Sequence, residues 1–322
     1  MNVAMISSWH VHAKGYAEEL KKQPNVTITA VWDEDPEAGE AWAKELGCKY
    51  CPDYDAILAD PTIDGIAMVA KTVDHGEMLL KAANAGKHIF TEKVLTITSE
   101  EAYAIRDAVN KNNVILTISY PHQCRPEILF AKKMMDEGAL GQITYARIRN
   151  VHNGSSAGWL PPHFYDAAQC GGGAMMDLGA HPMYLLNWFL GKPVSVQSCF
   201  TKVTGKPVED NAVSVLSYAN GAIGVSETGF VSQDNPFTLE LSGTKGALMV
   251  HGNKVSYAND ATENQWVEAT DLPEKWPDPI EQWVGAVTEG KENHLGIDAA
   301  VALTETMEGA YKAYESKATY EF

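Results

Sequence analysis

The sequence is short of basic residues and of long apolar runs. Its 25 Lys and Arg stand against 42 Asp and Glu, which gives a formal net charge of −17. This excess of negative charge repels nucleic acid and anionic lipid. No apolar run approaches the roughly 20 residues that a membrane-spanning helix needs. We therefore expect neither nucleic acid nor a membrane as a partner.

Cysteine is also scarce, and the N-terminal residues lack a targeting pattern. The chain has five cysteines, an odd number, which favours reduced thiols over a disulfide framework. The first 20 residues contain no basic segment followed by a long apolar stretch, so they do not resemble a secretion signal. Both observations predict a cytoplasmic protein.

The rest of the composition is that of a folded protein. Hydrophobic residues make up 45% of the chain and charged residues 21%. This balance excludes a disordered, collagen-like or coiled-coil protein. A length of 322 residues favours two domains.

Strand-like and helix-like patterns alternate over the first 120 residues. The expected strands are 2–6, 26–32, 64–69, 88–91 and 114–119, and the expected helices end near residue 22 or cover 37–46, 77–85 and 99–110. Strands separated by helices of this length indicate βαβ units and a parallel sheet. Ligands of such sheets bind at the carboxyl ends of the strands.

The alternation of strands and helices ends after residue 119. A helix over 126–137 precedes strand-like runs at 144–151, 194–201, 212–218, 222–228, 237–242 and 247–251. Short turns such as 219–221 and 243–246 separate several of these runs, which predicts antiparallel pairing. Further helices are expected over 183–190, 279–289 and 297–316.

The first strand-to-helix turn is the usual phosphate-binding place of a dinucleotide fold. Ser7, Trp9 and His12 stand where such a fold usually has three glycines. The following helix still offers free backbone N–H groups and the positive end of its dipole to an anion. An ordinary polar turn is the alternative interpretation.

Asp33 follows the second predicted strand, in the position of a ribose-binding carboxylate. A carboxylate there accepts hydrogen bonds from the adenosine ribose diol and repels a 2′-phosphate, which favours NAD over NADP. The alternative is a solvated acidic loop, which suits Glu34 and Asp35 better than Asp33.

A glycine-rich segment carries an acid and a histidine. Gly171, Gly172 and Gly173 precede Asp177 and His181, which are four residues apart and would share one face of a helix. A histidine supported by a carboxylate, together with a lysine such as Lys93, is suited to proton transfer. The alternative is a capped helix start with a buried histidine.

Short segments along nearly the whole chain form an ordered set with a recognisable pattern. They are residues 67–71 with His75, 82–88, Glu92-Lys93, Arg125-Pro126, 138–143, 171–181 with 188–191, 209–212 and 243–246. Together they resemble the glucose–fructose oxidoreductase, inositol dehydrogenase and MocA (Gfo/Idh/MocA) family. The resemblance implies an α/β fold with an N-terminal Rossmann NAD-binding domain over residues 1–121. It implies an α+β domain over 122–322 with a large, mostly antiparallel open sheet for substrate binding and oligomerisation. The last helices belong to the second domain or pack back on the first.

The same resemblance implies an activity. The expected enzyme transfers a hydride between nicotinamide and a hydroxyl-bearing carbon of a sugar, inositol or related polyol, and assembles as a homodimer or homotetramer. His181 would exchange the hydroxyl proton, Lys93 would stabilise negative charge on the oxygen, and Asp177 would orient the site electrostatically. The implied cofactor-binding positions are Ser7, Ser8, Trp9, His10, Val11, Asp33, Ala70, Thr72, His75, Glu92 and Lys93.

This sequence departs from the family at three places. Trp9 is bulky in the phosphate turn, Val94 replaces the proline expected after Lys93, and Tyr184 stands where many members have aspartate. Two other functions therefore stay open. One is an enzyme that retains NAD and uses transient oxidation to drive elimination or glycoside cleavage. The other is a non-catalytic regulator that binds a dinucleotide or a sugar.

Polar and aromatic residues are expected to contact the substrate. The candidates are His122, Arg125, Asn150, His152, Trp159, His163 and Tyr165, with packing roles as the alternative. No metal site is predicted, because His10 and His12 alone do not supply enough ligands. The Cys48–Cys51 spacing does not begin a helix after a strand, so we expect no redox function there.

Overall fold

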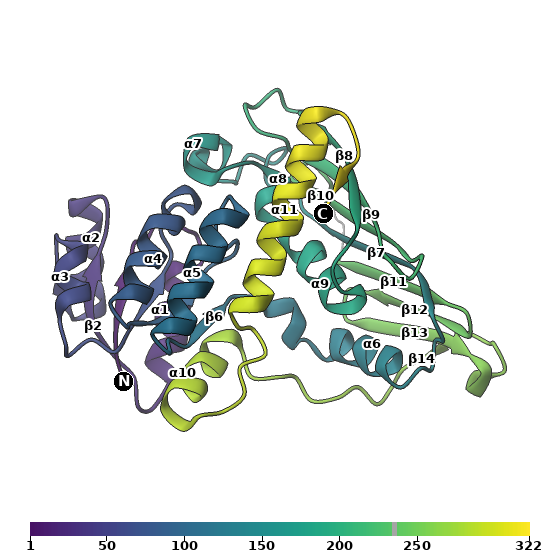
Figure 1. Cartoon of the computed structure of the whole chain (residues 1–322), viewed down its shortest axis with the longest axis horizontal. Coiled ribbons are helices and arrows are strands. Elements are labelled where there is room, and N and C mark those ends of the chain that lie inside the picture. Colours follow the sequence, from purple (N-terminus) through teal and green to yellow (C-terminus); the bar gives the residue numbers. More distant parts are fainter. Residues whose placement is uncertain (234–236) are drawn as a thin grey trace. The chain divides into compact units, whose positions relative to one another are not determined.

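The computed structural model describes residues 1–233 and 237–322, and it divides into two compact units (Figure 1). The first unit comprises Met1–Ser119 and Pro277–Thr304, and the second comprises Tyr120–Trp276 and Glu305–Phe322. Helix α11 (Ile297–Ser316) contains one of the boundaries between them.

The first unit contains the expected parallel sheet. Its strand order is β3-β2-β1-β4-β5-β6, which is the order of a doubly wound dinucleotide-binding fold. The strands are β1 (Asn2–Ile6), β2 (Thr27–Trp32), β3 (Lys49–Tyr50), β4 (Gly65–Met68), β5 (His88–Thr91) and β6 (Leu116–Ile118). All neighbouring strands pair in parallel, which confirms the predicted Rossmann sheet.

Local sequence signals set the helices of this unit. They are α1 (Ala13–Lys22), α2 (Pro36–Leu46), α3 (Tyr54–Ala59), α4 (His75–Asn84), α5 (Ser99–Lys111) and α10 (Pro279–Glu289), with a short 3-10 turn η1 (Thr72–Asp74). Asp35 caps α2 by accepting from the N–H groups of Glu37 and Ala38. Thr98 and Glu101 form a capping box at the start of α5.

Helix α10 belongs to the core of the first unit although it lies far along the chain. Its Trp283 is fully buried in a cluster that includes Phe90 of β5 and Val3 of β1. The rings of Trp283 and Phe90 are 6.0 Å apart. This packing is one of the two arrangements that the sequence left open for the last helices.

The second unit contains a nine-stranded sheet in the order β14-β13-β12-β11-β7-β10-β9-β8-β15. Its strands are β7 (Ile143–Val151), β8 (Ser195–Thr201), β9 (Asn211–Ser217), β10 (Ile223–Gly229), β11 (Thr238–Gly243), β12 (Gly246–His251), β13 (Lys254–Asn259), β14 (Val267–Glu268) and β15 (Tyr320–Glu321). Among the described residues of this sheet, β7 and β10 are the only neighbouring strands that pair in parallel. The predicted, mostly antiparallel sheet is therefore confirmed, and β13, β14 and β15 extend it beyond the predicted strands.

One face of this sheet is covered by helices and the other is open. Helix α9 (Ala180–Leu190) packs on β7 and β10, and α6 (Pro126–Asp136) contacts β12 (Figure 1). On the opposite face Val213, Val215 and Ile223 are exposed. Among the described helices, none has the length and apolar character of a membrane span.

The predicted single helical face for Asp177 and His181 is wrong. Asp177 is the last residue of α8 (Ala174–Asp177), whereas His181 lies in the first turn of the separate helix α9. Helix α9 also begins three residues before the predicted start at 183. Pro182 is tolerated there because the first turn of a helix contains N–H groups without an intrahelical partner.

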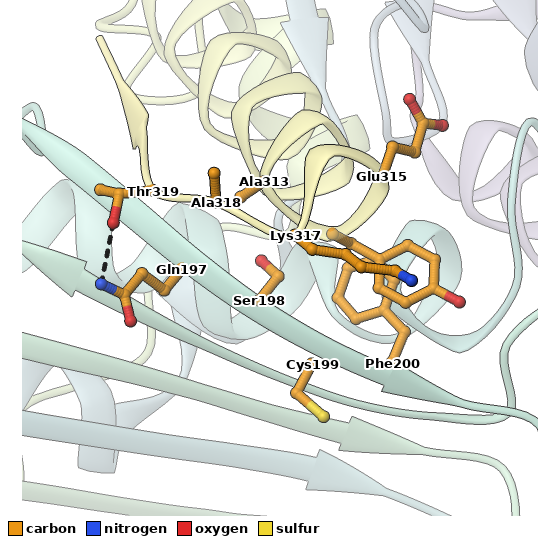
Figure 2. Close-up of a pocket in the computed structure, with 10 residues that line it drawn as sticks. Gln197, Ser198, Cys199, Phe200, Ala313, Glu315, Lys317, Ala318 and Thr319 are labelled. Carbon is orange, nitrogen blue, oxygen red and sulfur yellow. Dashed lines mark hydrogen bonds between the residues drawn. The ribbon is translucent and has the colours of Figure 1, made fainter.

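The second unit has a cavity of about 640 Å³ between β8 and the end of α11 (Figure 2). Beside it, the Gln197 side chain donates a hydrogen bond to Thr319 at 2.9 Å, and Phe200 stacks on Tyr314 with ring centres 4.6 Å apart. None of the residues predicted for catalysis, cofactor binding or substrate binding is among the described residues that line this cavity.

The role of α10 in the first unit can be tested with one substitution. We expect Trp283→Ala to lower the free energy of unfolding by about 3–5 kcal/mol, because it leaves a large cavity in the core. The matched control is Trp266→Ala, since Trp266 is 52% exposed and should change stability by less than about 0.5 kcal/mol. Urea unfolding followed by circular dichroism measures both, and equal effects would contradict the packing of α10.

Candidate active site and cofactor site

The first turn, between β1 and α1, lacks glycine and is held by side-chain hydrogen bonds instead. Ser7 adopts φ 69°, in the left-handed region that glycine normally occupies. The backbone N–H and the hydroxyl of Ser8 donate to Asp33 Oδ2 at 2.8 and 2.6 Å. Asp33 Oδ1 accepts from the N–H of Asp35 at 2.9 Å. The buried Asp33 carboxylate therefore fixes the turn, and both of its oxygens are already engaged within the loop.

The next residue, Glu34, offers a carboxylate oxygen that Asp33 does not. Glu34 Oε2 is buried and has no hydrogen-bond partner among the residues that the structure describes. Its Oε1 lies 3.8 Å from Lys71 Nζ. A buried acceptor without a partner at the carboxyl end of β2 is suited to a ligand hydroxyl. In the sequence, Glu34 is distinguished only by its place beside Asp33.

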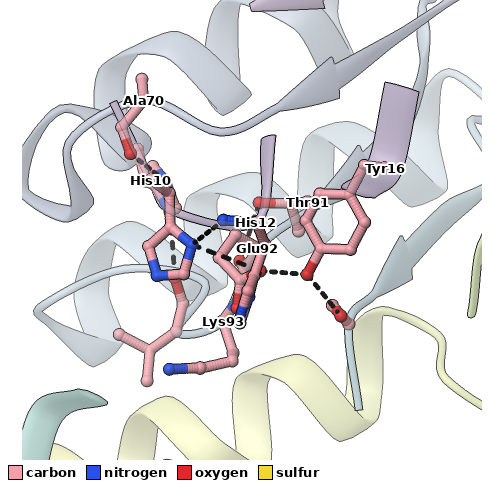
Figure 3. A network of polar contacts seen from close by, with 10 residues as sticks. His10, His12, Tyr16, Ala70, Thr91, Glu92 and Lys93 are labelled. Carbon is pink, nitrogen blue, oxygen red and sulfur yellow. Dashed lines mark hydrogen bonds and ion pairs between the residues drawn. The ribbon is translucent and has the colours of Figure 1, made fainter. Parts of the chain in front are cut away.

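A polar network surrounds Glu92 at the end of β5 (Figure 3). Its buried carboxylate accepts from the Tyr16 hydroxyl, from His12 Nδ1 at 3.1 Å and from the N–H of Lys93 at 3.1 Å. Burial works to raise the pKa of Glu92, but His10, His12 and Lys93 outweigh it and hold the pKa well below its ordinary value. Glu92 is therefore a carboxylate at neutral pH, and it links the first turn to Lys93.

The residues that follow β4 support the same edge of the sheet. His75 is buried, and its ring lies between two backbone carbonyls, with Nδ1 3.0 Å from the oxygen of Val94 and Nε2 3.2 Å from that of Ala70. Burial lowers the pKa of His75. The ring thus joins the loops after β4 and β5, and Thr72 is buried beside it in the 3-10 turn η1. The other predicted cofactor residues, Trp9 and Val11, lie in the first turn.

In the second unit, Glu209 organises the glycine-rich segment. Glu209 Oε1 accepts from the N–H groups of Gly173 and Met175 at 2.9 and 3.1 Å and from the Tyr311 hydroxyl at 2.6 Å. A Cβ atom at Gly173 would lie 2.1 Å from the backbone oxygen of Glu209, so only glycine fits this close approach. Because these contacts set the start of α8, they also set where Asp177 lies. Residues 209–212 belong to the segments that resemble the family, but no role is predicted for Glu209 from the sequence.

The structure surrounds His181 with aromatic partners. Its Nδ1 lies 3.0 Å from the Tyr184 hydroxyl, which also accepts from the N–H of His122 at 3.2 Å. The His122 ring stacks on His181 with centres 4.5 Å apart, and Tyr120 stacks on Tyr184 at 4.0 Å. Tyr184, seen in the sequence only as a departure from the family, is therefore a direct partner of the predicted catalytic histidine.

The negative charge of Asp177 helps to raise the pKa of the Cys170 thiol. Burial raises the pKa of Cys170 to about 12, and the negative charges of Asp177 and Asp166 contribute to the increase. Cys170 also donates to the backbone oxygen of His163 at 3.0 Å. The thiol is therefore protonated at neutral pH.

The predicted substrate residues fall into separate groups. Arg125 lies over the Phe237 ring, and Phe237 packs edge-on against His122, so these two predicted residues share one neighbour. His152 and Trp159 form a second group, with ring centres 4.7 Å apart.

The other three predicted residues are Asn150, His163 and Tyr165. The Tyr165 hydroxyl donates to Ser155 at 2.9 Å. Asn150 is the next-to-last residue of β7, and burial lowers the pKa of His163. The substrate roles of the whole set stay predictions.

Comparisons with known proteins cover both units. Residues 1–120 match the family description "Oxidoreductase family, NAD-binding Rossmann fold", and residues 128–249 match "GFO/IDH/MocA C-terminal domain". A scyllo-inositol 2-dehydrogenase (NAD(+)) of Bacillus subtilis is 27% identical over 75% of this chain and 70% of its own length. An inositol 2-dehydrogenase of Rhizobium meliloti is 26% identical over 90% of both chains.

Solved structures share the fold over the whole chain. GenD2 from gentamicin A biosynthesis, in complex with NAD, is 26% identical with a TM-score of 0.84, covering 100% of this chain and 96% of its own. Levoglucosan dehydrogenase, in complex with NADH and levoglucosan, is 22% identical with a TM-score of 0.86. The match covers 100% of this chain and 98% of that enzyme's chain.

The organising role of Glu209 leads to a stability prediction. Glu209→Ala removes the acceptor from two buried N–H groups and one hydroxyl, so we expect the free energy of unfolding to fall by about 3 kcal/mol or more. Tyr311→Phe removes one of the three hydrogen bonds and should lower it by about 1 kcal/mol. Urea unfolding compares the two variants. A loss in Glu209→Ala no larger than that in Tyr311→Phe would show that Glu209 does not hold the segment.

Proposed function

Because the chain belongs to the Gfo/Idh/MocA family of oxidoreductases, we propose that it transfers a hydride between a hydroxyl-bearing carbon of a sugar, inositol or related polyol and NAD. The observation that carries this function is the match of both units to one family of oxidoreductases with an NAD-binding Rossmann fold. The family match does not identify the substrate or the hydroxyl that reacts.

The first unit fits NAD at its carboxyl edge. Asp33 holds the first turn against the start of α1, whose N–H groups and dipole favour the diphosphate. The buried, unpartnered Glu34 Oε2 would accept a hydrogen bond from the adenosine ribose, and its negative charge would disfavour the 2′-phosphate of NADP. When bound, the nicotinamide accepts the hydride.

His181 is proposed to move the hydroxyl proton. Tyr184 engages Nδ1, so Nε2 is the nitrogen that we assign to the substrate. In the oxidation direction, neutral His181 takes the proton from the hydroxyl oxygen while the hydride leaves the attached carbon, and a C=O bond forms.

Lys93 and Asp177 are proposed to assist this step. The Lys93 ammonium would stabilise the negative charge that develops on the substrate oxygen, and Glu92 holds the backbone of Lys93 in place. Asp177, fixed at the end of α8 by the Glu209 contacts, would set the local field.

The two alternative functions lack a specific observation in their favour. The named relatives are dehydrogenases, which favours net oxidation over cleavage with retained NAD and over a non-catalytic regulator. The cytoplasmic location inferred from the cysteines stays a prediction.

Catalysis is tested by NADH formation in a screen of inositols and sugars. With the substrate found, we expect His181→Asn and Lys93→Met each to lower kcat by about 100-fold or more, the usual effect of losing a proton-transfer or charge-stabilising group. The control is His251→Asn, because His251 is exposed on β12. Full activity in both site variants would contradict the assigned roles, and a cleaved product without net NADH would favour retained NAD.

The open sheet face supports a homodimer or homotetramer. On this face Arg147 pairs with Glu227 at 2.9 and 3.0 Å and with Glu240 at 3.2 Å, beside the exposed apolar residues Val215 and Ile223. The two charge signs on this face neutralise one another within the chain, so that the same face of a second copy can meet it across a two-fold axis with the apolar flanks in contact. We assign a second copy of this chain as its partner.

Light scattering at micromolar concentration tests the assembly. We expect an oligomer for the natural chain and dissociation towards monomer for Val215→Asp, which would place a charge in the apolar part of the face. Val203→Asp is the matched control, since Val203 is 67% exposed and lies outside the sheet. A natural chain that is monomeric would overturn the proposal.

A further inference from the structure

Three side chains with metal-binding groups converge beside the first turn. His10 and His12 come from the turn itself, and Glu92 follows β5, about 80 residues away in the chain. One ligand atom from each of the three lies within 4.8 Å of the others. The sequence predicted no metal because two histidines one residue apart are too few ligands. The fold supplies the third.

The distances are close to those that a bound cation needs. Glu92 Oε2 lies 3.1 Å from His12 Nδ1 and 3.9 Å from His10 Nδ1. Ligand atoms about 2.0–2.2 Å from a tetrahedral zinc ion are separated by roughly 3.3–3.6 Å, so small side-chain adjustments suffice. A metal would replace the proton that His12 Nδ1 shares with Glu92.

Neighbouring groups already orient the carboxylate. Tyr16 donates to Glu92 Oε2, and the Ser119 hydroxyl lies 2.8 Å from the Tyr16 oxygen (Figure 3). The N–H of Lys93 bonds Oε1 and so fixes the other end of the carboxylate. Outer hydrogen bonds of this kind hold the ligands of metal sites in place.

The burial of the three ligands gives the site a closed side and an open side. Glu92 and His10 are 2% and 6% exposed, whereas His12 is 48% exposed. A cation could therefore enter past His12 and would keep coordination positions for water or another ligand. Two features oppose cation binding: the positive charge of Lys93, which helps to lower the pKa of Glu92, and the backbone N–H of His12, which donates to His10 Nδ1 at 3.3 Å. A cation at His10 Nδ1 would have to displace this weak contact.

We propose that His10, His12 and Glu92 form a binding site for one borderline divalent cation of the Zn²⁺, Co²⁺ or Ni²⁺ type. Two imidazole nitrogens and one carboxylate oxygen suit these ions, whereas Mg²⁺ and Ca²⁺ prefer oxygen ligands. Because His10 and Glu92 are predicted to contact NAD, the site is defined for the cofactor-free protein. The cation would bind whether or not the chain oxidises a sugar.

Calorimetric titration of the full chain with Zn²⁺ alone tests the site. The protein is first stripped of metal and cofactor, and its exposed cysteines are alkylated so that thiols such as Cys199 do not bind zinc. We expect one equivalent of zinc to bind with a Kd in the micromolar range or below. We expect His12→Ala to weaken binding by about 100-fold or more, as the loss of one of three ligands should.

Two further variants make the result decisive. Glu92→Gln keeps the shape of the side chain but removes its charge, and it should weaken zinc binding as His12→Ala does. His294→Ala removes an exposed histidine that lies 3.4 Å from Glu292, an ordinary surface pair, and should leave the affinity unchanged. Absence of zinc binding by the natural chain, or binding that survives His12→Ala, would overturn the proposal. Circular dichroism of each variant confirms that it is folded.

Discussion

Buried carboxylates that accept hydrogen bonds from backbone N–H groups hold the functional segments of both units. Asp33 accepts from Ser8 and Asp35, Glu92 from Lys93, and Glu209 from Gly173 and Met175. Such charge-assisted hydrogen bonds are among the stronger ones in proteins, and an unsatisfied buried N–H is unfavourable. Each carboxylate therefore fixes a loop that local propensity alone would leave undetermined.

This constraint explains how the first turn works without its usual glycines. Glycine normally supplies the left-handed backbone and the close approach that a diphosphate needs. Here Ser7 adopts that backbone while Asp33 and Ser8 stabilise it from the side. At the end of β2, both Asp33 oxygens are engaged within the loop, whereas Glu34 Oε2 has no hydrogen-bond partner among the described residues, which is why ribose binding is proposed for Glu34.

The sequence predicted the parts of the structure that depend on local patterns. Alternating strands and helices identified the parallel sheet, and tight turns identified the antiparallel one. Local patterns do not predict contacts between residues that are far apart in the chain. Glu209 lies 36 residues from Gly173, and α10 reaches the first core only through the tertiary packing of Trp283. For the same reason the sequence does not single out Glu34, because a buried oxygen without a partner is a property of the folded chain. Nor does it predict a role for Tyr184, because its hydrogen bond to His181 is formed only in the folded chain.

The most direct test of this account is calorimetric titration of cofactor-free protein with NAD and with NADP, using the natural chain and Glu34→Gln. We expect NAD to bind more tightly than NADP. We expect Glu34→Gln to weaken NAD binding about tenfold, the effect of about 1.4 kcal/mol from one hydrogen bond to a charged group. Tighter binding of NADP, or no binding of either dinucleotide by the natural chain, would contradict it.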